Sequence, residues 1–196
     1  EGRLVGVEEI GPNQDLAIAI PVGIKKLLSD AKCTLSDVNC VSVNVGPGGL
    51  SSTRCGVTYA NALSFGLRIP IVGIRRFELV GSLAWKAKNI PALCIQRASL
   101  GKAYIAIYEN GDLSKQTFST LSEAMVSFID LKKEFVLAGA LPANIPSAFS
   151  SFEYVPEESI PRIAKEMISI ADRKMLIGDF KNCPIEALNE GSAEFS

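Results

Sequence analysis

The sequence predicts an α/β protein of two lobes, and three observations lead to this class. Residues 38–45 and 69–74 are rich in Val and Ile, as strands are, and the segment between them has the spacing of a helix. Two further apolar runs, 92–95 and 103–108, follow a polar stretch that ends at Pro91. We therefore expect a first lobe at residues 1–89 and a second α/β lobe at residues 90–196.

The amino-acid composition excludes several classes of protein. The chain has 196 residues, and its 47% hydrophobic content is enough for a buried core. A formal net charge of -1 offers no basic surplus for tight direct binding to nucleic acid. No apolar run has the length of a membrane span and no signal peptide is visible, so we expect a cytoplasmic protein. Five cysteines without a C-x-x-C pair favour free thiols over disulfides or zinc.

The first elements follow from periodicity. Residues 4–7 have the composition of a short strand. Apolar residues at helical spacing then predict a helix over residues 16–31, with Asn13 as its N-cap. Pro21 falls inside this pattern, so we expect it to kink the helix or to lie near its start.

A glycine-rich turn separates the strand at 38–45 from the next helix. Ser51 or Ser52 can cap this helix, which is expected to run toward Leu67. The turn fits two interpretations: a corner that needs residues without a Cβ, or an anion site made of backbone N–H groups. It completes neither the dinucleotide fingerprint nor a P-loop. The candidate anion-binding residues are Gly46, Gly48, Gly49 and Arg54.

One ridge of the same helix carries small residues. Ser52, Gly56, Ala60 and Ser64 recur every four residues, so another backbone can approach the helix closely there. The approaching partner can be this protein's own sheet, another of its helices or a helix of a second subunit, and these alternatives stay open.

The rest of the chain predicts a mixture of strands and helices. Gly101 and Asn110-Gly111 read as turns, and Pro161 suits the first turn of a helix. The polar tail beyond Leu188 is expected to be disordered. The expected helices are 77–84, 121–128 and 160–171, and the expected strands are 92–95, 103–108 and 135–139.

The chain contains no histidine. A Ser-His-Asp triad, a Cys-His dyad and H-E-x-x-H zinc chemistry are therefore impossible within it. We expect no catalytic residues and no metal ligands, and hence no intrinsic protease activity.

The residues around the turn resemble those of the bacterial TsaB (YeaZ) family, which was once classified with glycoproteases. The match is convincing from about residue 11 to residue 108. The resemblance implies the actin-like fold shared with sugar kinases and Hsp70. It also implies an N-terminal hairpin with an acidic, phosphate-binding loop, which we expect to be missing here because the sequence opens at what looks like the following turn. The matching residues are Gly46-Pro47-Gly48, Arg54, Gly56-Val57, Ala60, Leu63, Gly66-Leu67, Ile69-Pro70 and Val72-Gly73.

The resemblance also implies a function. Such proteins support a TsaD-like transferase that makes the t6A base of tRNA, so we expect a non-catalytic scaffold or activator. It would contact a TsaD-like partner or a second copy of itself. Further partners would be a TsaE-like ATPase and, indirectly through the complex, tRNA. ATP or ADP would bind only in the complex. The alternative is an enzyme or nucleotide-binding domain that uses the Gly46–Arg54 turn. The expected partner interface comprises Leu16, Ile20, Ile24, Ser52, Gly56, Ala60 and Ser64.

Overall fold

The computed structural model describes residues 3–129, 134–143, 145–149, 151–156, 159–182, 184–189 and 192. The chain forms two compact units. The first comprises Glu1–Arg75 and Ser159–Ala187, and the second comprises Arg76–Glu158 and Leu188–Ser196. This division differs from the expected one at residues 89 and 90. The helix after Arg75 packs on the second unit's sheet, whereas the C-terminal helix returns to the strands of the first unit.

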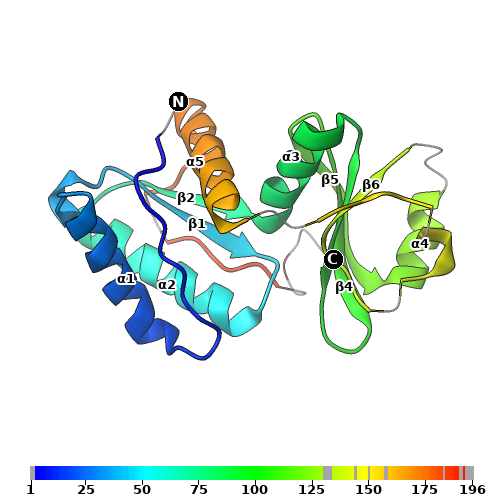
Figure 1. Cartoon of the computed structure of the whole chain (residues 1–196), viewed down its shortest axis with the longest axis horizontal. Helices are drawn as coiled ribbons and strands as arrows, with labels where there is room; N and C mark the ends of the chain where they lie inside the picture. Colours follow the sequence, from blue (N-terminus) through cyan, green and yellow to red (C-terminus); the bar gives the residue numbers. More distant parts are fainter. Residues whose placement is uncertain are drawn as a thin grey trace. The chain divides into compact units, whose positions relative to one another are not determined.

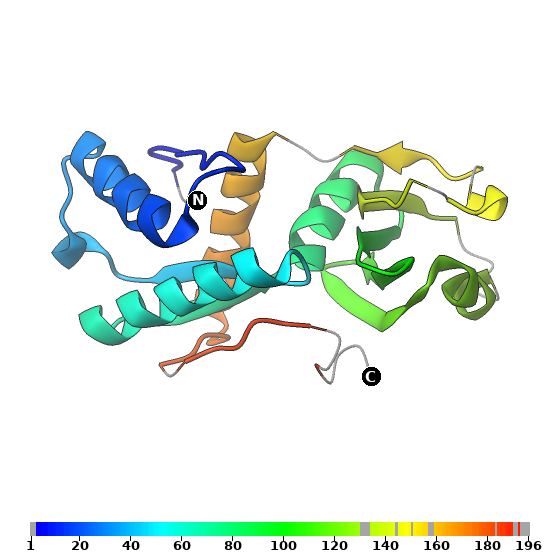
Figure 2. The same ribbon diagram turned by 90° about the horizontal axis from the view of Figure 1, so that it is seen from below.

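The first unit is built on two parallel strands. β1 (Val41–Gly46) pairs with β2 (Ile71–Arg75), and α2 (Leu50–Leu67) connects them. α2 and α5 (Ile160–Leu176) both pack on these strands, from opposite faces (Figure 1). α1 (Leu16–Asp30) lies beside α2 (Figure 2), and a short 3-10 turn, η1 (Leu35–Asp37), leads to β1. The sequence predicts that the helices at residues 16–31 and 52–64 lie side by side, and this prediction is confirmed.

Local details of the first unit differ from the expected ones. The N-cap of α1 is Asp15, whose Oδ1 accepts a hydrogen bond from the backbone N–H of Ala17 at 2.9 Å, so the assignment to Asn13 was wrong. The N-cap of α2 is Gly49 rather than Ser51 or Ser52. The hydroxyl of Ser52 instead donates to the carbonyl of Gly49 at 2.8 Å. Residues 4–7 form no strand, because no neighbouring segment pairs with their backbone among the described residues.

The second unit contains a five-stranded mixed sheet. Its order is β5-β4-β3-β6-β7, antiparallel across β5, β4 and β3 and parallel across β3, β6 and β7. Asn110 and Gly111, both with positive φ, make the tight turn between β4 and β5. The elements are α3 (Arg76–Lys88), β3 (Ala92–Arg97), β4 (Lys102–Glu109), β5 (Asp112–Thr120), α4 (Leu121–Ile129), β6 (Val136–Ala140), η2 (Ser147–Phe149) and β7 (Tyr154–Val155).

Both faces of this sheet are covered. Alternate residues of β3, β4 and β6 face α3 in one cluster, where Phe77 packs with Cys94 and Ala106. The intervening residues, such as Ile95 and Ile105, form a second cluster with the start of α4. Strands covered on both faces explain the nearly continuous apolar runs in this part of the sequence.

Most predicted elements of the second unit are confirmed, with shifted ends. The sequence missed β5 because its residues are mostly polar, and it missed the two-residue β7. The expected disorder of the tail concerns residues that mostly lie outside the described part of the chain. Within the described part, no helix is both long and apolar enough to span a membrane.

Candidate functional site

The pair of helices α1 and α2 carries most of the residues expected to bind a partner. On α1, Leu16, Ile20 and Ile24 are half-buried. The outward stripe of α1 starts with Ile18 and Val22, one helical turn apart and 65% and 61% exposed. These two aliphatic side chains were missed from the sequence. Their i, i+4 spacing outside the main apolar stripe was the signal that could have revealed them.

The small-residue ridge of α2 faces mostly inward. Ser52 is exposed, whereas Ala60 and Ser64 are only 5% and 7% exposed. A Cβ on Gly56 would lie 4.0 Å from a methyl group of Val43 in β1. The hydroxyl of Ser64 donates to the carbonyl of Ile69 at 2.6 Å. Within this chain, Gly56 therefore faces β1, Ser64 bonds to the segment before β2, and Ala60 is buried. Contact of the ridge with a second subunit stays a prediction.

A different stripe of α2 faces outward. Arg54, Thr58, Ala62 and Phe65 are exposed, and they recur at intervals of three and four residues. Phe65 is 84% exposed. Thr58 and Ala62 are also small, so this second face permits close approach as well. The two neighbouring helices thus each expose apolar side chains, Ile18 and Val22 on α1 and Ala62 and Phe65 on α2.

The glycine-rich turn joins β1 to α2. Gly46 and Pro47 are buried, and the amide side chain of Asn44 accepts a hydrogen bond from the N–H of Gly46 at 2.9 Å. Gly49 caps α2 without a side-chain hydrogen bond, which leaves backbone N–H groups at a positive helix end. Arg54, one turn into the helix, is exposed. The corner and the anion site remain compatible with this arrangement.

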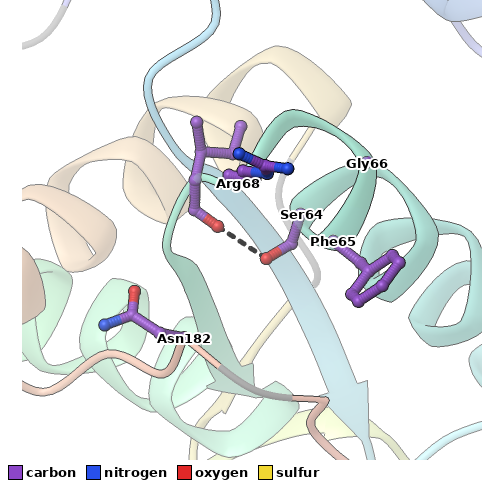
Figure 3. A pocket seen from close by; sticks show the side chains of 6 residues that line it. Ser64, Phe65, Gly66, Arg68 and Asn182 are labelled. Atoms are coloured by element: carbon purple, nitrogen blue, oxygen red, sulfur yellow. Dashed lines mark hydrogen bonds between the residues drawn. The ribbon is translucent and has the colours of Figure 1, made fainter.

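A shallow pocket lies at the other end of α2. It encloses about 590 Å³ and is lined by Ser64, Phe65, Gly66, Arg68, Ile69 and Asn182. The ring of Phe65 and the amide of Asn182 lie on either side of the Ser64–Ile69 hydrogen bond (Figure 3). Arg68 takes the left-handed conformation that ends the helix. Arg68 and Asn182 are exposed, and the buried hydroxyl of Ser64 already donates to Ile69, so the pocket defines no chemistry by itself.

The four described cysteines are free. Burial raises the pKa of the Cys94 thiol strongly, and burial together with the nearby charge of Asp172 raises that of Cys40. Raised pKa values leave these thiols protonated at neutral pH, which disfavours a nucleophilic role for Cys94 and Cys40.

The fold places this chain in a known class of α/β proteins. It resembles the crystal structure of a Pseudomonas aeruginosa protein described as similar to the peptidase YEAZ, with a TM-score of 0.67 over 92% of this chain and 87% of the other. YeaZ from Pseudomonas aeruginosa gives a TM-score of 0.65 over 90% and 86%. Sequence identities are 15% and 16%, so these matches establish the YeaZ-type fold alone.

The sequence itself places the chain in a family. Residues 13–141 match the model of the family described as TsaD, tRNA N6-adenosine threonylcarbamoyltransferase. The chain therefore belongs to this family, and its resemblance to the TsaB (YeaZ) members is confirmed.

The curated relatives include TsaB proteins as well as threonylcarbamoyltransferases. The tRNA threonylcarbamoyladenosine biosynthesis protein TsaB of Buchnera aphidicola is 35% identical over 123 residues, which are 59% of this chain and 59% of that protein. TsaB of Escherichia coli is 24% identical over 53% of this chain and 45% of the relative. A threonylcarbamoyltransferase of Syntrophus aciditrophicus is 39% identical over 37% and 21%. The chain thus spans at most 59% of the length of these relatives.

Proposed function

We propose that this protein is a non-catalytic accessory subunit of the machinery that makes threonylcarbamoyladenosine in tRNA. In this role it binds a TsaD-like transferase through the outward faces of α1 and α2. The name shared by the TsaB relatives supports the pathway. The observation that carries the binding role is the exposure of Ile18 and Val22 on α1 and of Ala62 and Phe65 on α2.

The physical argument rests on exposure. Single exposed apolar side chains are ordinary, but these residues lie on two helices that pack against each other. Fully burying an aliphatic side chain is worth about 1.5–3 kcal/mol, so Ile18 and Val22 alone can contribute substantially to association. Small residues at positions 58 and 62 let a partner helix approach the backbone of α2.

The chemistry of the chain supports an accessory role. Without histidine the chain lacks the usual general base, and the raised pKa values of Cys94 and Cys40 disfavour thiolate attack by these residues. In this proposal the transferase supplies catalysis and any nucleotide site. The TsaE-like ATPase, tRNA and a second copy of this chain remain further proposed partners, the first two reached through the complex.

The test places charges on the outward face of α1. We expect Ile18→Asp and Val22→Asp each to weaken binding to a TsaD homologue by at least about 10-fold, because a buried unpaired carboxylate is costly. Isothermal titration calorimetry measures the affinity, and circular dichroism measures the thermal midpoint. The control is Val126→Asp, which changes an exposed valine on α4 of the second unit. Unchanged affinity in both α1 variants would contradict the proposal.

The start of α2, where no side chain caps the backbone N–H groups, favours a second candidate function, binding of a nucleotide or another anion by the isolated chain. Backbone N–H groups at this end and the nearby Arg54 are suitable ligands for a phosphate. Titration of the isolated chain with ADP and ATP distinguishes the two functions. Saturable binding that Arg54→Ala abolishes would favour this second candidate, whereas the accessory role predicts no binding without the partner.

A further inference from the structure

The C-terminal segment of the first unit ends in a short strap, residues 184–187, that lies against α2 and the sheet. The backbone N–H and C=O of Ile185 both pair with one side chain, the amide of Asn61 on α2. Asn61 Nδ2 donates to the carbonyl at 2.9 Å, and Asn61 Oδ1 accepts from the N–H at 3.0 Å. A carboxamide that pairs with both groups of one residue recognises extended backbone, because only there do the two groups point to the same side.

The side chain of Ile185 packs at a specific position on β2. A Cβ on Gly73 of β2 would lie 3.4 Å from Cδ1 of Ile185 and 3.1 Å from a methyl group of Val45. The missing side chain of Gly73 therefore leaves a depression beside Val45, and the end of Ile185 reaches it. Asn61 and Gly73 together recognise backbone geometry and an aliphatic side chain, which are the two components of peptide recognition by strand-like segments.

The strap is weakly held compared with the elements around it. Ile185 and Ala187 are half-buried, and Pro184 and Glu186 are exposed. The preceding chain is anchored separately: Lys181 exchanges two 2.9 Å backbone hydrogen bonds with Ile71. Residues held by few hydrogen bonds and one side chain open locally without unfolding of the rest.

The contacts that precede the strap determine how far toward α5 a local opening of the chain can extend. α5 ends at Leu176 and is followed by Gly178 at φ +77°. The N–H groups of Gly178 and Asp179 bond to the carbonyls of Met175 and Lys174, respectively. Lys174 and Asp179 also form an ion pair at 3.1 Å. The segment up to Lys181 is therefore fixed to α5 and β2, and Leu188, directly after the strap, packs against the cluster that contains Phe77 and Cys94. Between these two anchors the strap itself is held by Asn61 and Gly73.

We infer that Asn61, Gly73 and Val45 form a binding site for an extended peptide segment with a branched aliphatic side chain, and that the strap is its resident, exchangeable occupant. The inference rests on contacts within the first unit and does not depend on the proposed function.

Amide hydrogen exchange of the full chain tests whether the strap opens by itself. We expect the amide of Ile185 to exchange at least about 100-fold faster than that of Val72 in the buried strand β2, at a rate that low urea leaves unchanged. Ile185→Ala should accelerate this amide about 10-fold without affecting Val72. Ile177→Ala, at an exposed position of the same unit, is the matched control. Equal rates at both amides, or equal acceleration, would show that the strap is part of the cooperative core and would overturn the inference.

Peptide binding tests the site itself. The probe is the hexapeptide Pro-Ile-Glu-Ala-Leu-Asn, the sequence of residues 184–189, added to full-length protein and followed through the amide signal of Gly73. The Ile185→Ala chain should bind it at least about 10-fold more tightly than the natural chain, because its own strap competes less. Adding Asn61→Ala, or replacing the peptide's Ile by Ala, should abolish binding. Equal binding by all four combinations, or no binding to Ile185→Ala, would overturn the inference.

Discussion

The two units of this protein differ in how completely their large apolar side chains are buried. In the second unit, α3 and α4 cover the two faces of a five-stranded sheet, and the strands β3, β4 and β6 are almost entirely buried. In the first unit, the sheet has two strands in the described part of the chain, and several large side chains point to solvent. Exposed large apolar residues there are Val5, Ile18, Val22, Leu35, Leu50, Phe65, Ile160, Leu176 and Ile177. The described part of the second unit exposes fewer, namely Leu100, Val126, Ile145 and Tyr154.

This difference separates residues that stabilise the fold from residues available for association. A side chain in a closed core loses both its transfer free energy and its packing contacts when it is truncated. An exposed side chain contributes little to folding until a partner covers it. The second unit should therefore respond to mutation mainly in stability, and the outward faces of α1 and α2 mainly in binding.

Two phenylalanines give the largest expected contrast. Phe77 of α3 is completely buried against the second unit's sheet, so Phe77→Ala should reduce the free energy of unfolding by about 3–5 kcal/mol. Phe65→Ala on the outward face of α2 should change it by less than about 0.5 kcal/mol. Urea unfolding followed by circular dichroism measures both values. Similar losses for the two variants would break the comparison.

Two helical glycines give the next contrast. A Cβ on Gly81 of α3 would lie 2.4 Å from Cβ and Cγ of Tyr108 on β4, so Gly81→Ala should destabilise the protein by about 1–3 kcal/mol. Nothing lies within 4 Å of a Cβ on Gly66, near the end of α2. Gly66→Ala should therefore stabilise by about 0.5–1 kcal/mol through helix propensity. The urea midpoints of these variants should shift in opposite directions, and a stabilising Gly81→Ala would refute the close contact.

The smallest expected effect is a pH dependence that the two units share. Two hydrogen bonds from Thr120 lower the pKa of Glu123 at the start of α4, and Thr34 lowers that of Asp37 in η1 in the same way. A folded-state pKa below the unfolded value gives stability that is present above the unfolded pKa and lost as pH falls through the folded one.

Glu123→Gln should therefore weaken the protein at pH 7 and make the fall in its urea midpoint between pH 5 and pH 3 shallower. Asp37→Asn should act in the same direction in the first unit. A steeper acid loss in either variant would contradict the capping role.

Local pattern determined most helices and the apolar strands of this protein. The spacing of apolar residues predicted α1, α2, α3 and α5, and the Asn110-Gly111 turn was readable because it needs two residues with positive φ. The sequence also settled one chemical question, because a chain without histidine cannot form a triad. The sequence did not predict the strand β5, because its own residues are mostly polar and its pairing with β4 stabilises it.

Only the tertiary structure decided which way each face points and which distant segments meet. Gly56, Ala60 and Ser64 are small, so they carry too weak a hydrophobic signal to distinguish burial within this chain from a contact with another subunit. The pairing of Asn61 with Ile185 joins residues 124 positions apart, and contacts at that separation leave no local pattern in the sequence. For the same reason, the packing of α5 on β1 and β2 rather than on the second sheet became visible only in the folded chain.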